Sequence, residues 1–309
     1  MARYGANSLA LAKMESVYGT DSGPTHGANP MLAREVKVGI PSDPIERKLL
    51  KPTMGNLARP ITRRHASVEI EVELQSSGAA GTPPAWGPLV RACGFAQTIT
   101  AGVKVEYTPI STAFESATLW FYADGVLHKQ PGCRGTMKLV IPKNEIPHAV
   151  FTLSGLYVDP SDAGTPTGVD WSAFKAPKAI SYVNTPTFTL HGTPSVMRTL
   201  EVDIANNVVF RDLVGATDVQ ITGRDPKGMV SIEAVPTATK DWYAAAKAET
   251  LAAMAFQHGS TAGSIIEINA PKAQVISVDY AEEDGILYND FELNIAENLG
   301  NDELVLVCR

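Results

Sequence analysis

The 309-residue sequence contains few cysteines and no long apolar run, and these two shortages exclude several classes of protein. Cys93, Cys133 and Cys308 are widely spaced and form no CxxC pair, which argues against a disulfide framework and a zinc site. The apolar run at residues 8–12 is too short for a secretory signal, and no stretch approaches the roughly 20 apolar residues that span a bilayer. We therefore expect reduced thiols, no membrane segment and synthesis in the cytoplasm.

Positive charge and catalytic motifs are also scarce. The formal net charge is −7, and no block of Lys and Arg resembles the basic stripe of a nucleic-acid-binding protein. The sequence contains no Gly-x-Ser-x-Gly, no GxGxxG, no phosphate-binding GxxxxGK[ST] and no HExxH motif. We predict no catalytic, cofactor-binding or metal-ligating residue, and hence no enzyme.

Alternating strands dominate what the sequence does contain. Residues 67–74 place four aliphatic side chains on one face and three carboxylates on the other, which predicts a half-buried strand. A short helix is predicted within residues 86–95, because Pro88 suits a first turn and Gly94 a C-terminal stop. Period-two spacing then runs over residues 104–158, where Asp124-Gly125 is a strong hairpin signal and Pro131-Gly132 a second break.

The second half of the chain has the same kind of pattern. An Ala-rich segment at residues 240–249 predicts its helix. Strands are predicted at residues 200–204, 229–234, 265–268, 275–278, 286–295 and 303–307. The predicted fold class is mainly β with one short helix in each half.

The two halves can be aligned, which suggests an internal duplication. Residues 68–72 match 230–234, and residues 135–143 match 263–272 with one insertion. Chance similarity between alternating strands is the competing explanation. The predicted organisation is an N-terminal extended arm with one short helix near its start, a first β domain, a linker and a second β domain. Their bounds are 1–60, 61–175, 176–195 and 196–309.

The carboxylates on the predicted strands allow three interpretations. A glycosidase pair is disfavoured, because neighbours on one strand face lie about 7 Å apart and repel one another. A solvated strand face is the ordinary interpretation. The third is the lining of a channel through which a polyanion slides without sticking. The candidate residues for that lining are Glu69, Glu71, Glu73, Glu201, Asp203 and Glu233.

Residues 82–95, with the sequence TPPAWGPLVRACGF, resemble the major tail tube proteins of long-tailed, siphovirus-type bacteriophages. The likeness covers nearly the whole chain from about residue 50 onward. It continues through residues 107–111, 124–129, 155–158, 207–211, 222–226 and 300–303.

This resemblance implies a structural virion protein that assembles in the host cytoplasm into stacked rings, forming the tail tube through which the genome is delivered. The fold implied is two tandem β-sandwich or barrel domains whose strands join a barrel between subunits, with arms and loops reaching the next ring. The implied partners are copies of the chain itself, the tape measure protein, and the tail terminator and distal tail proteins, while DNA passes without sticking.

The resemblance also bears on the size of the ring. Tail tubes whose subunit carries one copy of the fold generally close as hexamers. Because barrel diameter depends on the total number of strands, a duplicated subunit favours a trimer with pseudo-sixfold symmetry over a hexamer.

Two other classes of protein compete with this interpretation. A β-sandwich binding module, for carbohydrate or for virion decoration, would need a flat aromatic platform. Trp120, Phe121 and Tyr122 are consecutive, so they alternate between faces of a strand and do not form one. A secreted hydrolase lacks both the signal peptide and the nucleophile motif.

Overall fold

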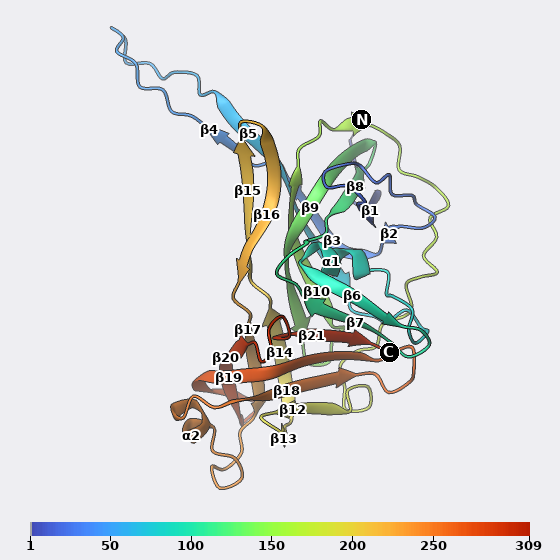
Figure 1. Ribbon diagram of the computed structural model, residues 1–309, viewed down its shortest axis with the longest axis vertical. Coiled ribbons are helices and arrows are strands. Elements are labelled where there is room, and N and C mark those ends of the chain that lie inside the picture. The colour runs from blue at the N-terminus through green and yellow to red at the C-terminus, as the bar shows by residue number, and fades with distance from the viewer. Residues whose placement is uncertain (1) are drawn as a thin grey trace.

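The computed structural model describes residues 2–309 and consists mainly of antiparallel β-strands (Figure 1). Two short helices interrupt the strands, α1 (Gly87–Ala92) and α2 (Trp242–Lys247). The prediction of a mainly β fold with one short helix in each half is confirmed. Pro88 lies in the first turn of α1, and Asp241 caps α2 by accepting a 2.8 Å hydrogen bond from the Ala244 backbone N–H.

Most strands fall into two groups that follow one another along the chain. The first group is β1 (Ser8–Met14), β2 (Pro30–Met31), β3 (Ala33–Gly39), β5 (Ile61–Glu73), β8 (Ala117–Ala123), β9 (Val126–Ile141), β10 (His148–Leu156) and β11 (Ser161–Asp162). The second group is β12 (Thr187–Leu190), β13 (Thr193–Pro194), β14 (Met197–Asp203), β17 (Lys227–Glu233), β18 (Leu251–His258), β19 (Ile266–Glu283), β20 (Ile286–Ala296) and β21 (Val305–Cys308). The remaining strands are β4 (Ser42–Pro44), β6 (Phe95–Thr100), β7 (Lys104–Pro109), β15 (Asn206–Leu213) and β16 (Ala216–Arg224).

One antiparallel sheet runs through both groups in the order β3-β5-β10-β9-β14-β17-β20-β19. We call it the main sheet. The two groups meet where β9 pairs with β14, with Leu139 opposite Val202 and Ile141 opposite Leu200. All four of these side chains are buried. Across residues 2–309 the sheets do not close into a barrel, so β3 and the end of β19 form the two edges of the main sheet.

Each group also contains a smaller side sheet, and the long strands β9 and β19 belong to both sheets. The side-sheet orders are β2-β1-β8-β9-β11 and β13-β12-β18-β19-β21-β7-β6, so β7 and β6 from the first half of the chain complete the second side sheet. Pro131 lies inside β9, where the strand changes partner from β8 to β10, so Pro131-Gly132 bends one strand and does not end it. Asp124-Gly125 forms the predicted hairpin turn, and both residues have positive φ angles.

The shared strand order confirms the internal duplication, and a shared irregularity fixes its register. The pairing of β3 with β5 shifts at Arg34, and the pairing of β14 with β17 shifts at Arg198. Aligning these two bulges and following the pairings across each sheet equates Ile70 with Val230, Phe151 with Phe291 and Pro131 with Pro271. We call this alignment the repeat register.

The residue matches predicted from the sequence are wrong in detail. In the repeat register Val68 corresponds to Gly228 and not to Val230, a difference of two residues. Likewise Gly135 corresponds to Val275 and not to Gly263. The reason is that alternating strands resemble one another at every even shift, so side-chain pattern alone does not distinguish one register from another.

The N-terminal segment also differs from the extended arm predicted for residues 1–60. Ser8–Met14 is not helical but forms β1, which pairs along its whole length with β8 and buries Leu9 and Leu11. Residues 40–60, which include β4, extend away from the rest of the chain at the upper left of Figure 1, beside the β15–β16 hairpin. The strand order assigns β1 to β3 to the first repeat and places β12 inside the predicted linker.

The hydrophobic core lies between the main sheet and the two side sheets and is continuous through both repeats. Trp86 fills the first repeat and donates a 2.8 Å hydrogen bond from Nε1 to the Gln75 carbonyl. Trp242 fills the second repeat, with its ring centroid 5.1 Å from that of Phe291. Because the core takes the apolar face of the main sheet, the polar side chains of the same strands point away from it.

Replacing Phe151 or Phe291 with alanine should lower the free energy of unfolding by about 3–5 kcal/mol, since each is a buried ring at the centre of its repeat. Equilibrium urea unfolding of the monomer would measure this. Tyr182→Ala is the control, because Tyr182 is 98% exposed and its loss should leave stability unchanged. A loss below about 1 kcal/mol at either phenylalanine would contradict the assignment of equivalent core positions.

Candidate functional site

The face of the main sheet that points away from the core, here called the open face, carries the acidic residues predicted from the sequence. On β5, Glu69 and Glu71 alternate with the buried Val68, Ile70 and Val72. By the same alternation all six candidates lie on this one face. They are Glu69, Glu71 and Glu73 on β5, Glu201 and Asp203 on β14, and Glu233 on β17.

The sequence analysis missed the cations of the open face. Ion pairs join Glu69 to Lys37 at 2.8 Å, Glu71 to Arg34 at 2.9 Å, and Glu201 to Lys138 at 2.5 Å. The hydrogen bond to Glu69 raises the pKa of Lys37, and Glu35 adds to the effect. Within residues 2–309, the remaining candidates Glu73, Asp203 and Glu233 take part in no ion pair.

The second repeat adds carboxylates to the open face that the sequence analysis also missed. They are Asp279 on β19, and Asp290 and Glu292 on β20. Their period-two positions along two adjacent strands were the available signal. A bulge at Ile276 reverses the alternation within β19, so the face of Asp279 depends on a feature that the sequence pattern does not reveal.

A shallow groove of about 530 Å³ follows the open face across β14, β17 and β20. Its lining contains no histidine or cysteine, and the Ser231 hydroxyl donates a 2.5 Å hydrogen bond to the Asp290 carboxylate. The same carboxylate accepts a hydrogen bond from Arg198, so Ser231 and Asp290 belong to a polar network that crosses the groove.

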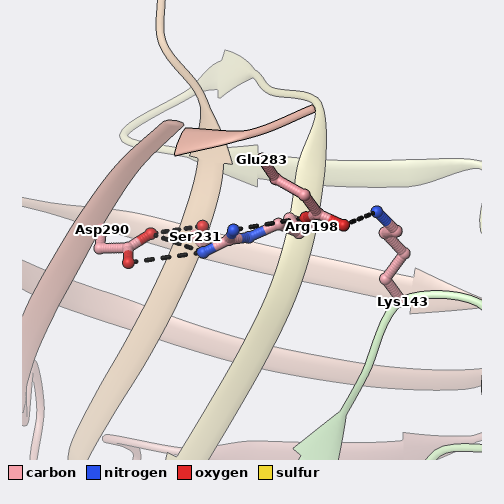
Figure 2. A network of polar contacts seen from close by, with 5 residues as sticks. All are labelled: Lys143, Arg198, Ser231, Glu283 and Asp290. Atoms are coloured by element: carbon pink, nitrogen blue, oxygen red, sulfur yellow. Dashed lines mark hydrogen bonds and ion pairs between the residues drawn. The ribbon is translucent and has the colours of Figure 1, made fainter. Parts of the chain in front are cut away.

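Arg198 is the centre of a polar network at one end of the open face (Figure 2). Its guanidinium donates to Asp290 at 3.2 Å and to Glu283 at 3.4 Å, and it stacks over the Tyr288 ring at 4.7 Å. Lys143, which follows β9, donates to the same Glu283 at 2.5 Å. The network connects the β19–β20 hairpin of the second repeat to both β14 and the first repeat.

The interactions of Glu283 with Lys143 and Arg198 require an ionised Glu283 carboxylate, so the network depends on pH. The hydrogen bond from Lys143 keeps the pKa of the Glu283 carboxyl below its ordinary value, and Arg198 acts in the same direction. A carboxyl group whose pKa is lowered by folding stabilises the fold at pH values above its ordinary pKa. This stabilisation is lost as the pH falls through the lowered pKa. The network is therefore intact at neutral pH.

Other kinds of site receive no support from the described residues. Within residues 2–309, no group of His, Cys, Asp and Glu is arranged to hold a metal ion, and neither helix is long and apolar enough to cross a membrane. Cys93, Cys133 and Cys308 are free and buried. Trp120 and Tyr122 pack against each other on one face of β8, with ring centroids 6.5 Å apart, and Phe121 points to the other face.

Apolar side chains at the two edges of the main sheet are exposed, whereas the side chains at the equivalent positions of the β9–β14 junction are buried. Tyr280 on β19 is 66% exposed, and its equivalent on β9, Leu139, is 1% exposed. Ile40, which follows β3, is 41% exposed, and its equivalent Ile204 is 1% exposed. Unpaired edges with exposed apolar residues are templates for pairing with another chain.

A second pair of equivalent segments behaves in the same way. The β15–β16 hairpin connects β14 to β17 and packs on the first repeat, where Phe210 stacks on His65 at 4.9 Å and Arg134 donates to the Val219 carbonyl at 2.9 Å. Residues 40–60 occupy the same position between β3 and β5. This segment projects into solvent, and Leu50 and Met54 are fully exposed.

A continuous β-sheet with two unpaired edges and a polar open face is the arrangement expected of a structural protein that joins further copies through its edges. A family model described as phage tail tube protein matches residues 5–295, and the chain belongs to this family. No curated protein matches the sequence. The family is structural, its members are components of the virion tail, and membership implies self-association into a tube.

Replacing Arg198 with alanine should lower the free energy of local opening of the β19–β20 hairpin by about 1 kcal/mol, because the partly exposed Glu283 and Asp290 lose their shared donor. Native-state hydrogen exchange at residues 284–288 would measure the change. Lys143→Ala, which leaves the bonds from Arg198 in place, should have a smaller effect. Unchanged protection in the Arg198 variant would show that the network does not hold the hairpin.

Proposed function

We propose that this protein is the major tail tube protein of a long-tailed, siphovirus-type phage. Copies join edge to edge through their main sheets into a closed barrel, and the rings stack into a conduit for genome delivery. The observation that carries the proposal is the pair of free edges, which repeat the strands that join the two halves of a single chain. Closing the ring pairs the backbone groups that each edge leaves open.

We further propose that three chains close each ring. The main sheet contains four strands from each repeat in the same order, so one chain supplies two equivalent units of a barrel. Barrel diameter follows total strand number and tilt, and it does not depend on which strands share a chain. An alternative in which the second repeat decorates the outside of a six-membered ring is disfavoured, since its strands continue the same sheet.

Native mass spectrometry of rings, or a cryo-EM reconstruction of the tube, should give three copies of the 33.0 kDa chain in each ring. The density should show pseudo-sixfold symmetry on the channel side, because the repeats differ in side chains but share their strand order. Six chains in each ring would refute the trimer while leaving the tail tube function in place.

We propose that the open face lines the channel. The groove lining contains Lys227, which takes part in no ion pair within residues 2–309, but the carboxylates of the lining outnumber its cations. A polyanion moving along this surface meets those carboxylates, while Arg34, Lys37, Lys138 and Arg198 are already held in ion pairs. Pairing lowers the attraction of these cations for passing phosphates, so the surface repels DNA or is neutral towards it. The remaining proposed partners are the tape measure protein, the tail terminator and the distal tail proteins.

Changing Glu73, Glu233 and Glu292 together to lysine should leave tubes assembled but slow DNA ejection, because none of the three takes part in an ion pair within residues 2–309 and each added cation binds the sliding backbone. Ejection from mutant virions would be followed by dye fluorescence at increasing salt. The delay should shrink as the salt concentration rises, as expected for counterion release.

A variant with the same change in charge controls for this experiment. Glu145→Lys, Glu249→Lys and Glu297→Lys together change loops outside the strands of the main sheet, and virions that carry all three should eject at the normal rate. Normal ejection by the open-face variant as well would refute the channel assignment.

Residues 40–60 are proposed to dock on a neighbouring copy. Their counterpart, the β15–β16 hairpin, packs on the adjacent repeat of its own chain, and the exposed Leu50 and Met54 provide apolar surface for an equivalent contact. The polar connection between the repeats, within residues 159–194, is a second candidate for contact with the next ring.

A further inference from the structure

We propose that Asp279 of one copy and Lys37 of its neighbour form an ion pair across the ring junction, and that this pair is the charge-reversed counterpart of Lys138–Glu201 within the chain. The reversal determines which strand edges join and in which register. The inference rests on the proposed ring assembly and adds the contact that specifies it.

The template is the junction between β9 and β14 inside one chain. Val202 lies opposite Leu139 on the core side, and Asp203 lies opposite Lys138 on the open face. Lys138 reaches diagonally to Glu201, with 2.5 Å between Nζ and Oε2. Apolar packing and one ion pair together fix this register.

The repeat register carries this geometry to the free edges. On the β14 side, the aligned bulges equate Glu201 with Lys37 and Val202 with Val38. On the β9 side, the equivalence of Phe151 and Phe291 equates Lys138 with Asp279 and Leu139 with Tyr280. A junction built in the same way therefore places Val38 of one copy opposite Tyr280 of the next.

The charges at this junction are complementary, but with opposite polarity to the template. The template has a lysine on the β9 side and a glutamate on the β14 side, whereas the free edges have Asp279 on β19 and Lys37 on β3. Asp279 is exposed and has no ion-pair partner within residues 2–309. Lys37 is exposed on the same face and already contacts Glu69 and Glu35, which leaves one of its three ammonium protons for a third carboxylate.

An ion pair with lysine on the β19 side and glutamate on the β3 side would also have joined two copies. The reversed charges have an additional effect, which is to disfavour the wrong strand pairings. If β3 of one copy paired with β9 of another, Lys37 and Lys138 would be diagonal neighbours of like charge. If β19 paired with β14, Asp279 and Glu201 would be diagonal neighbours of like charge. Juxtaposed like charges are a known way of rejecting wrong partners. The reversed pair thus opposes strand exchange between the repeats of different chains and favours β19 joining β3.

Charge reversal in the purified full-length protein tests this contact. Asp279→Lys and Lys37→Asp should each abolish tubes that sediment and are visible by negative stain, and the double variant should restore them. Circular dichroism should show each single variant folded. Glu292→Lys makes the same change in charge on the open face of the adjacent strand β20, opposite Ser277, and should assemble like wild type.

The outcomes separate this inference from the proposed function. If wild-type protein forms tubes and either single variant also does, or if the folded double variant does not recover, the ion pair is refuted and the tube function stands. If wild-type protein forms no rings or tubes, the proposed function fails, and the junction fails with it.

Mixing the two single variants adds a test based on parity. Asp279→Lys presents lysines at both edges and Lys37→Asp presents aspartates at both, so complementary junctions require the two variants to alternate around the ring. Alternation closes only in rings with an even number of chains. With three chains the mixture should form no closed rings; closed rings from the mixture would support the ion pair and overturn the trimer.

A cysteine pair tests the register directly. Val38→Cys combined with Tyr280→Cys should form a disulfide between neighbouring copies in assembled tubes and give covalent closed rings on non-reducing gels. Val36→Cys with Tyr280→Cys is the control, because it is displaced by two residues and lies beyond the usual disulfide span. The native cysteines are buried, and burial raises the pKa of the Cys308 thiol to about 12, so they should not compete. Cross-linking of the displaced pair alone would overturn the proposed register.

Discussion

The pairing of β9 with β14 is the interaction on which the rest of the structure depends. It converts two four-stranded sheets into one main sheet, and it buries Leu139, Ile141, Leu200 and Val202 where the repeats meet. Without it each repeat would leave an edge strand with unpaired backbone groups and exposed aliphatic side chains. The same pairing places the acidic residues of β5 and β14 on one surface, although they lie far apart in the sequence.

The duplication explains why the chain contains one paired junction, between β9 and β14, and also two unpaired edges, β3 and the end of β19. The main-sheet strands of each repeat end in two different edges. Joining the repeats pairs β9 of the first with β14 of the second, and it leaves β3 of the first and β19 of the second unpaired. The shared bulges at Arg34 and Arg198 keep the strands of both repeats in the same register. Each of these arginines also contacts the hairpin next to it, Arg34 through His148 and Arg198 through Tyr288, which are equivalent positions.

The candidate site was only partly predictable. Glu69, Glu71 and Glu73 were found because alternation on a single strand reports which side chains share a face. Their partners Arg34 and Lys37 were missed because β3 lies in a segment rich in glycine, proline and polar residues, which resembles an arm. The alternation of Val36, Val38 and Ile40 with polar residues or glycine was the available signal, and the pairing with β5 identifies the segment as a strand.

By itself the sequence determined the elements that depend on local chemistry: the alternating strands, the helices beside Trp86 and Trp242, the Asp124-Gly125 turn and the existence of a duplication. Only the tertiary structure decided the register of that duplication, the passage of β9 and β19 through two sheets, and the ion pair between Lys138 and Glu201. The physical reason is that period-two patterns look the same after any even shift, whereas a bulge or a pairing partner is fixed by backbone hydrogen bonds between distant segments.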